Sequence, residues 1–156
     1  MNMARVILIA AVVAMAGCGR SADVAAITSE VRALHRAAVE AHLKKDAAFL
    51  ARNHSERYFA VKDGEVSFPS PRDTAAGFAD YLNNTAFSEY RELAEPMVGC
   101  SRDGSLVWAV GRVKVKGVRR VADGSERPVD FSCAWLTLYE RRGKELFRLG
   151  DVSTFK

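Results

Sequence analysis

The C-terminal half of the sequence, from about residue 92 to residue 155, constrains the fold more than any other stretch. Apolar runs rich in strand-forming residues are separated there by Asp103-Gly104, Asp123-Gly124 and Arg142-Gly143. Glycine adopts the positive φ angles that tight hairpin turns require, so each pair predicts a reversal between antiparallel strands. We therefore predict a meander of four strands.

Counting outward from the three turns gives a strand register. It pairs Cys100 with Val107, Val113 with Ala134, and Leu138 with Phe147. Because side chains alternate between the two faces of a strand, this register predicts an inner face that is apolar except for one acid. That face contains Val98, Cys100, Val107, Ala109, Val113, Ala134, Leu136, Leu138, Phe147, Leu149 and Asp151. The opposite face contains Met97, Trp108, Val110, Arg112, Lys114, Cys133, Trp135, Tyr139, Arg148 and Val152.

Helices are predicted in the first half of the chain. Apolar residues recur at helical spacing over 28–45, and Asp46 is a suitable N-cap for a short helix over 47–53. Ser70 followed by Pro71 predicts the start of a third helix that ends near residue 83. We expect these three helices to cover the inner face of the sheet.

A hairpin is predicted between the second and third helices. Asp63-Gly64 matches a type I′ turn, and counting outward pairs Val61 with Val66 and Phe59 with Phe68. This register assigns Tyr58 to the face opposite Phe59. The whole chain is thus predicted as an α+β domain with an antiparallel sheet packed against three helices.

The first residues are predicted to be a signal peptide that directs export. Arg5 precedes an apolar run of about eleven residues, which is too short to cross a bilayer of roughly 30 Å as a helix. Met15-Ala16-Gly17-Cys18 follows and resembles the lipobox of bacterial lipoproteins, with methionine in place of the usual leucine. The resemblance implies cleavage before Cys18 and lipidation of its sulfur. The alternative is an ordinary secretory signal with an incidental cysteine.

The division of the chain follows from this signal. Residues 1–17 are predicted as the signal peptide, 18–26 as a tether and 27–156 as the folded domain. Removing Arg5 lowers the formal charge from +4 to +3, which is too small to indicate nucleic-acid binding. The predicted location is the periplasmic side of a bacterial envelope membrane, and Gly19 after the cysteine favours the outer membrane.

The order of elements and several short segments resemble the nuclear transport factor 2-like superfamily, in particular its SnoaL-like and ketosteroid-isomerase-like branch. The matching segments are AHLKKDAAFL (41–50), YFAVKDG (58–64), Asp103-Gly104 before Trp108, and YERRGKELFRLGDVS (139–153). Phe147 stands where the family commonly has tryptophan. The resemblance implies a cone-shaped sheet around a pocket, and often a dimer through the outer sheet face. It implies no single activity, because this fold hosts enzymes and non-enzymes.

Asp151 is the candidate catalytic residue, because an acid among apolar neighbours is suited to proton transfer. The alternative is a structural role near the end of its strand, where the carboxylate bonds to an amide, a hydroxyl or a base. Tyr58 and Tyr81 are candidate donors to it only if they point inward. The predicted pocket residues are Phe59, Phe78, Leu136 and Phe147.

The candidate interface lies on the outer face and consists of Trp108, Arg112, Trp135 and Tyr139. Either it is a solvated basic strand with Arg112 stacked on Trp135, or it is a contact surface, for which a homodimer is the expected form. No metal site or cofactor is predicted, because His35 and His42 are about 10 Å apart along one helix and His54 is expected to be exposed. No disulfide is predicted, because Cys100 and Cys133 fall on opposite faces of non-adjacent strands.

Three functions remain open on the sequence alone. We expect a lipid-anchored, non-catalytic binding protein whose partner is a small apolar ligand or another envelope protein. The first alternative is an isomerase or dehydratase with Asp151 as the acid–base group. The second is a structural subunit of an envelope assembly that uses the outer face.

Overall fold

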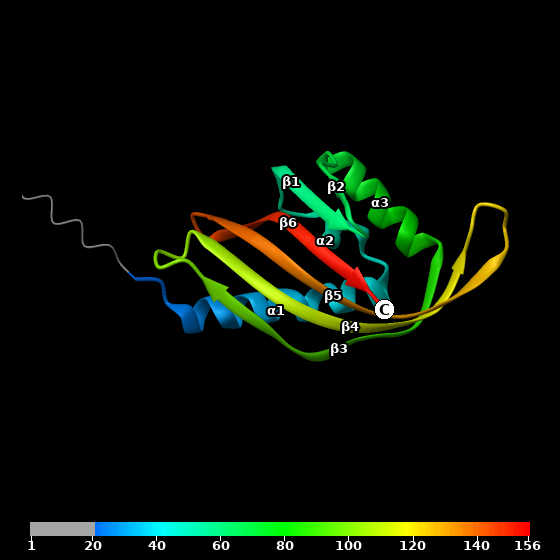
Figure 1. Ribbon diagram of the computed structural model, residues 1–156, viewed down its shortest axis with the longest axis horizontal. Helices are drawn as coiled ribbons and strands as arrows, with labels where there is room; N and C mark the ends of the chain where they lie inside the picture. The colour runs from blue at the N-terminus through cyan, green and yellow to red at the C-terminus, as the bar shows by residue number, and fades with distance from the viewer. Residues whose placement is uncertain (1–20) are drawn as a thin grey trace, which may run out of the picture.

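The computed structural model describes residues 21–156, so Cys18 and the predicted signal peptide lie outside the described residues. The helices are α1 (Val24–Lys44), α2 (Ala47–Ala51) and α3 (Pro71–Asn83). The strands are β1 (His54–Lys62), β2 (Glu65–Ser67), β3 (Thr85–Cys100), β4 (Leu106–Arg120), β5 (Glu126–Arg142) and β6 (Glu145–Phe155). Figure 1 shows α1 and α2 running along one side of the long strands, with α3 beside the β1–β2 end of the sheet. Within residues 21–156 no helix is both long and apolar enough to cross a membrane.

The three helices begin at residues whose side chains cap free backbone N–H groups. Asp23 accepts from the amide of Ala26, so α1 begins at Val24 and the end of the predicted tether is helical. Asp46 caps α2 as predicted, although α2 ends at Ala51 rather than at residue 53. Ser70 caps α3, which has the predicted bounds.

The six strands form one sheet in the order β2-β1-β6-β5-β4-β3. The prediction of a curved α+β sheet against three helices is confirmed, but the sheet is mixed rather than purely antiparallel. β1 pairs with β6 in parallel, whereas the other neighbours are antiparallel. The first half of the chain therefore joins the sheet beside its last strand.

Two of the predicted hairpin registers are confirmed. Val61 pairs with Val66 across a turn in which Asp63 and Gly64 both have positive φ. Cys100 pairs with Val107 across the Asp103-Gly104 turn. Tight two-residue and Asx-type turns leave little freedom in the register, which is why counting outward succeeds there.

The register predicted between β4 and β5 is wrong by one residue. Val113 pairs with Cys133 rather than with Ala134. The amide of Val121 donates to the carbonyl of Ser125, which leaves three residues in the loop, and Gly124 adopts a φ of 80°. Because a two-residue turn was assumed, the predicted count was off by one, and a one-residue slip moves every β5 side chain to the other face.

The register predicted between β5 and β6 is also wrong. The turn is Gly143-Lys144, so Glu140 rather than Leu138 pairs with Phe147. A β-bulge follows, because Tyr139 pairs with Arg148 while Leu138 pairs with Gly150, and Leu149 has no partner in this ladder. Asp151 therefore pairs with Thr137.

These shifts rearrange the predicted faces. Ala134, Leu136, Leu138 and Phe147 belong to the outer side, whereas Cys133, Trp135, Tyr139 and Arg148 belong to the inner side. Cys100 and Cys133 thus lie on the same face, not on opposite faces, and both are free thiols. The prediction that His54 is exposed is also wrong, since its side chain is partly buried.

The core lies between the inner sheet face and the helices. Val31 of α1, Val107 and Val115 of β4, and Leu82 of α3 are completely buried. Apolar contacts form three clusters rather than one continuous core.

Candidate functional site

A cavity of about 830 Å³ opens between the concave sheet face and helices α1–α3. Its apolar wall is made largely by aromatic and aliphatic side chains from five elements. They include Leu34 and Ala38 of α1, Phe49 and Leu50 of α2, Phe78 of α3, Tyr90 of β3 and Trp135 of β5. Pockets of this size and lining hold drug-sized molecules.

The polar groups of the cavity converge on Asp151. The Tyr58 hydroxyl donates to Oδ2 of Asp151 at 3.0 Å, and the Thr137 hydroxyl donates to Oδ1. Nε of Arg148 lies 3.7 Å from Oδ2, which is ion-pair distance. The two side chains of this ion pair are four-fifths buried. Both carboxylate oxygens therefore already have partners within the protein.

The β-bulge at Leu149 makes this cluster. In a regular strand, residues three apart point to opposite faces. The extra residue places Arg148 and Asp151 on the same inner face, and Thr137 is directly opposite Asp151 on β5. Tyr58 reaches them from β1, whose pairing with β6 is shifted between His54 and Phe59. Ala60 pairs with Asp151, so Tyr58, two residues earlier on β1, also points inward. Tyr58 and Phe59 lie on opposite faces as predicted, but Tyr58 rather than Phe59 is on the inner one.

The protonation states of this cluster follow from burial and charge. Burial and the neighbouring Asp151 raise the pKa of Tyr58, so its hydroxyl remains a donor at neutral pH. Burial lowers the pKa of Arg148, but Asp151, Tyr139 and Tyr58 outweigh it and raise that pKa overall. Arg148 is therefore a cation, and its charge balances the carboxylate of Asp151.

Two histidines of α1 line the cavity as neutral groups. His35 is 5% exposed and stacks on Trp135, with ring centroids 5.8 Å apart. Burial, followed by the charge of Arg148, lowers the pKa of His35 to about 4. Burial likewise lowers the pKa of His42 to about 4, although its bond to the Ala38 carbonyl opposes the shift.

The hydrogen bonds of His42 define its tautomer. Nδ1 lies 2.7 Å from the carbonyl oxygen of Ala38 and must donate to it, because a carbonyl only accepts. Nε2 of the neutral ring is then the acceptor for the Tyr90 hydroxyl at 3.2 Å. The ring also stacks on Tyr90, with centroids 4.1 Å apart. His42 is thus held by contacts on both nitrogens and one face.

Two other groups bear on the chemistry of the site: Cys133, which lines the cavity, and His54, which lies beside Tyr58. Burial raises the pKa of Cys133 to about 11, so this thiol is protonated at neutral pH and is a poor nucleophile. His54 lies edge-on to Tyr58, with centroids 4.6 Å apart, and its Nε2 is buried without a hydrogen-bond partner. No three histidine, cysteine or acidic side chains among residues 21–156 are placed to share a metal ion.

The sequence-based site residues are distributed over both sides of the sheet. Of the four predicted pocket residues, Phe78 lines the cavity, whereas Phe59, Leu136 and Phe147 do not. Of the four predicted interface residues, Trp108 and Arg112 are exposed, whereas Trp135 and Tyr139 line the cavity. Arg112 therefore does not stack on Trp135. The β4–β5 register shift accounts for the error on β5.

Sequence reasoning did not find most of the polar site. Thr137, Arg148 and His35 were not proposed as site residues, and Tyr58 was assigned to the wrong face. One signal was present for Arg148 and Asp151: Gly150 stands between them, and glycine in a strand often accompanies a bulge. A bulge there brings both charges to one face.

Comparison with known proteins shows the fold. No known family's sequence profile matches the chain, and no curated protein matches it in sequence. It is similar to a solved protein of cystatin-like fold from Caulobacter vibrioides, with 13% identity, a TM-score of 0.66 and coverage of 83% of this chain and 89% of that one. A nuclear transport factor 2-like superfamily protein from Salmonella enterica serovar Typhimurium gives 12% identity, a TM-score of 0.63 and coverage of 83% and 91%.

A third similar structure is a nuclear transport factor 2-like protein from Rhodospirillum rubrum, described as of unknown function in nutrient uptake. It shares 16% identity, with a TM-score of 0.59 and coverage of 86% of this chain and 99% of that one. At these identities the likeness defines the fold and no activity. The chain is an α+β protein of nuclear transport factor 2-like fold.

Proposed function

We propose that this domain binds a small, largely apolar and uncharged molecule in its cavity, without transforming it. The observation that carries this proposal is the charge balance around Asp151 in an open cavity of about 830 Å³. The other charged residues of the lining are exposed: Glu30, Arg52, Lys62, Lys144 and Glu145. Its interior ion pair cancels, and the two histidines that line it are neutral at pH 7. A ligand with a net charge would find no uncompensated partner beside Asp151, and burying an unpaired charge is costly.

The polar cluster then serves as an orienting group. Asp151 fixes the positions of three donors, and lone pairs of Tyr58 and Thr137 remain to accept a hydrogen bond from a ligand hydroxyl. The apolar body would lie against the wall that contains Trp135 and Phe78. Such a site, with few polar groups in an apolar pocket, is typical of small-molecule binding.

Trp135 offers a direct test, because the chain has only two tryptophans. In the Trp108→Phe variant, Trp135 is the sole tryptophan and reports on the cavity. We expect the neutral probe N-phenyl-1-naphthylamine to quench it at least about tenfold more tightly than 1-anilinonaphthalene-8-sulfonate, which adds one negative charge to a similar body. Equal binding of the two probes would contradict the charge argument.

The reciprocal variant is the matched control. Trp135→Phe keeps only Trp108, which lies on the outer face. Quenching of Trp108 by the neutral probe with the same affinity would show that the probe binds the outer surface instead. Weak or absent quenching of Trp108 supports binding in the cavity.

An enzyme of the isomerase or dehydratase kind, as in the SnoaL-like and ketosteroid-isomerase-like branch, is the second candidate function. It is favoured by the two hydroxyls that converge on the Asp151 carboxylate inside an open cavity. A base needs a free lone pair toward its substrate, and the partners of both oxygens leave Asp151 less available. Conversion of a retained molecule by the wild type, but not by Asp151→Asn, would favour the enzyme over the binding protein.

We further propose that the domain is anchored in the bacterial envelope through lipidated Cys18, on the periplasmic side and preferably in the outer membrane. The small residues Ala16 and Gly17 before the cysteine support this proposal. Since α1 begins at Val24, the connecting residues span at most about 20 Å. Incorporation of labelled palmitate that is lost in Cys18→Ser tests the anchor. An unmodified mature chain beginning elsewhere would reject it.

A further inference from the structure

The cavity is elongated, because its lining follows two elements over most of their length. On α1 the lining residues extend from Glu30 to His42, which is roughly 18 Å of helix. On β6 they extend from Glu145 to Ser153, which is roughly 25 Å of strand. A volume of about 830 Å³ over such a length gives a mean cross-section of about 35–45 Å². The cavity is therefore long and narrow rather than round.

One end of the cavity is bordered by side chains from three elements. Glu30 of α1 reaches this end, where it forms an ion pair with Arg141 at 2.6 Å. Asn53, which follows α2, also reaches it, because its Nδ2 donates to the carbonyl of Leu146 at 3.4 Å. We define the rim as the charged lining residues at this end that make no ion pair within residues 21–156: Arg52, Lys144 and Glu145.

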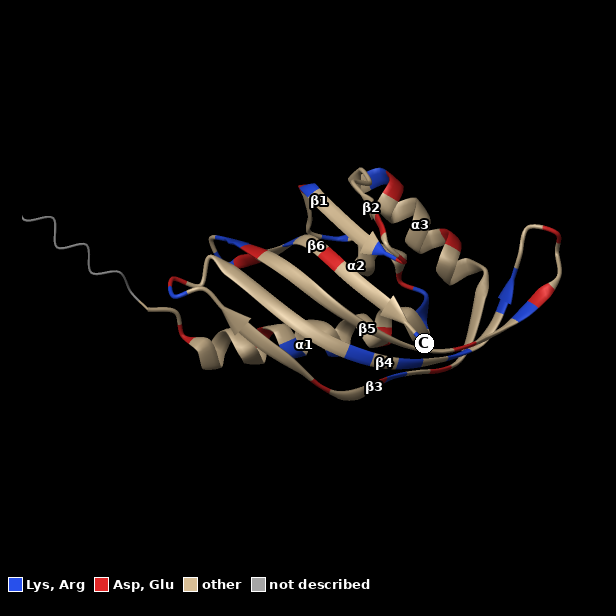
Figure 2. Cartoon of the chain, viewed as in Figure 1, with Lys and Arg blue, Asp and Glu red and all other residues tan. Residues whose placement is uncertain are grey.

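The rim presents charges of both signs to solvent. Arg52 and Lys144 are exposed cations, and Glu145 is an exposed anion. Figure 2 shows blue and red residues next to each other at the β5–β6 turn, which carries the last two. The guanidinium of Arg52 lies over the ring of Phe49, 3.8 Å from its centroid, and Phe49 lines the cavity. Arg52 is thus held where the apolar wall meets water.

The interior beyond the rim offers no free charge beside the polar cluster. The charges of Arg148 and Asp151 cancel, and His35 and His42 are neutral at pH 7. Lys62 lies at the far end of the cavity, where β1 and β6 make their last pairing. An apolar chain can lie between the rim and the far end, whereas a charged group there would be buried without a partner.

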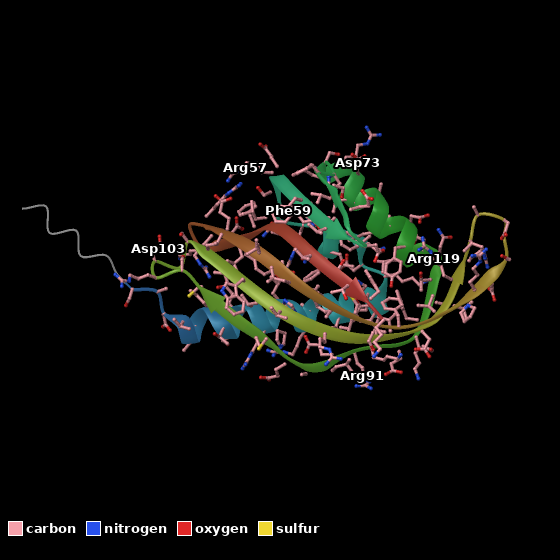
Figure 3. The ribbon with its side chains drawn as sticks, in the orientation of Figure 1. Arg57, Phe59, Asp73, Arg91, Asp103 and Arg119 are labelled. Atoms are coloured by element: carbon pink, nitrogen blue, oxygen red, sulfur yellow. The ribbon has the colours of Figure 1, made fainter. Side chains whose placement is uncertain are left out.

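The rim lies at the end of the domain where the described chain begins. The amide of Ala22 donates to the carbonyl of Arg102 in the β3–β4 turn, and the amide of Arg141 donates to another carbonyl of that turn. The start of α1 and the β5–β6 turn are therefore neighbours, at the left in Figure 1, and Asp103 marks the β3–β4 turn in Figure 3. The proposed lipidation of Cys18 would bring the rim close to a bilayer, which is a source of amphiphiles.

From these observations we propose that the ligand is a zwitterionic amphiphile with one hydrocarbon chain, whose chain lies in the cavity and whose head group stays at the rim. A phosphate facing Arg52 and Lys144, with an ammonium beside Glu145, matches the charges of the rim. A cavity of this volume holds a drug-sized molecule, which suits one chain and not the two chains of a membrane phospholipid. The inference rests on the proposed binding function and names the class of ligand.

Displacement of the neutral probe N-phenyl-1-naphthylamine by alkylphosphocholines tests this inference. The full-length chain carries Cys18→Ser, so that neither an acyl anchor nor a detergent competes for the cavity. Below the concentrations at which the amphiphiles form micelles, we expect their affinity to rise about fourfold for each methylene between about eight and twelve carbons, because each added methylene is buried.

A double variant tests the role of the rim. Arg52→Gln with Lys144→Gln removes both cations, so alkylphosphocholines should bind about fivefold to tenfold more weakly at low salt. The affinity of the neutral probe should stay within about twofold of the wild type. The matched control is Arg72→Gln with Arg102→Gln, which removes two exposed cations outside the cavity lining and should leave both affinities unchanged.

Two results would overturn this inference and leave the proposed binding function intact. One is an affinity for alkylphosphocholines that does not rise with chain length, although the neutral probe binds. The other is an affinity that the rim variant leaves unchanged, or that the control variant lowers equally, because the head group would then lie elsewhere. If the neutral probe does not bind either, the proposed binding function fails together with this inference.

Discussion

The two faces of this sheet differ from those of an ordinary half-exposed sheet, because the apolar inner face contains a buried polar cluster and the outer face carries exposed apolar side chains. The inner face buries an ion pair, a threonine and a histidine, and still encloses an open cavity. The polar groups of the inner face can be buried because each carboxylate oxygen of Asp151 has a hydrogen-bond partner. The exposed apolar side chains of the outer face, such as Met97 and Trp108, have no cover within residues 21–156.

This comparison also separates two expected properties. The proposed ligand binding would depend on groups of the inner face, such as Trp135 and Arg148, while the expected self-association would depend on exposed residues of the outer face, such as Met97 and Trp108. β5 contributes alternate residues to both, since Trp135 points inward and Leu136 outward. Variants on adjacent positions of this strand can therefore affect one property without the other.

The largest expected effect comes from protonating the inner face. The pKa of both His35 and His42 is lowered to about 4 in the folded protein, against about 6.5 in the unfolded chain. The contribution of such a histidine to the free energy of unfolding is complete above pH 6.5. It is lost as the pH falls toward 4, because the histidine takes up its proton in the unfolded state first. Protonation of each histidine should lower the free energy of unfolding by up to about 3 kcal/mol as the pH falls from 6.5 to 4.

Urea unfolding at pH 7 and at pH 4.5 measures this loss. His42→Gln removes one titrating group while it keeps a side chain able to donate and accept, so it should reduce the slope of stability against pH. Asp103 does not titrate in this window, because hydrogen bonds from Ser101 and Ser105 lower its pKa to about 2. If the slope of the free energy of unfolding against pH between 6.5 and 5 is the same in His42→Gln and the wild type, groups other than His42 cause the loss of stability.

A second prediction compares two valines on β4. Val113 is 1% exposed on the inner face, whereas Val110 is partly exposed on the outer face. Val113→Asp buries an unpaired carboxylate and should lower the free energy of unfolding by about 4 kcal/mol. Val110→Asp should lower the free energy of unfolding of the monomer by less than about 1 kcal/mol. Chemical unfolding at low protein concentration compares them, and similar losses would mean that the two faces are equally covered.

A third prediction concerns the inner ion pair. Arg148→Met leaves the Asp151 carboxylate with only the hydroxyls of Tyr58 and Thr137, and should lower stability by about 2–3 kcal/mol. Adding Asp151→Asn removes the unpaired charge, so the double variant should be more stable than Arg148→Met alone. Additive losses from the two changes, measured in the same unfolding experiment, would show that the two side chains do not interact.

Much of the fold could be predicted from local signals, and the site could not. Helix caps such as Asp46 and Ser70 act within one turn of chain, and the Asp63-Gly64 and Asp103-Gly104 turns define their own registers. The loop after β4 has three residues where two were assumed. That single residue reversed the predicted faces of β5, and no apolar pattern corrected it, because both faces of β5 carry large apolar residues.

The inner cluster depends on longer-range geometry. Arg148 and Asp151 share a face only because Leu149 is bulged, and Tyr58 points inward only because the β1–β6 ladder shifts. Asp151 was assigned to the inner face by a register that was wrong by more than one residue. Its predicted neighbours were therefore apolar, whereas its actual neighbours are two hydroxyls and a guanidinium.

The smallest expected effect compares two phenylalanines. Phe68 is 77% exposed at the β2 end of the sheet, so Phe68→Ser should change the stability of a single copy by less than about 0.5 kcal/mol. Phe78 packs against the α2–α3 cluster and lines the cavity, so Phe78→Ser should cost about 2 kcal/mol. Thermal unfolding at low and high protein concentration measures both. If two copies pair through the outer face, Phe68→Ser should lower the unfolding temperature only at high concentration, while Phe78→Ser should lower it equally at both. A loss for Phe68→Ser that does not depend on concentration would mean that its ring is covered within one copy.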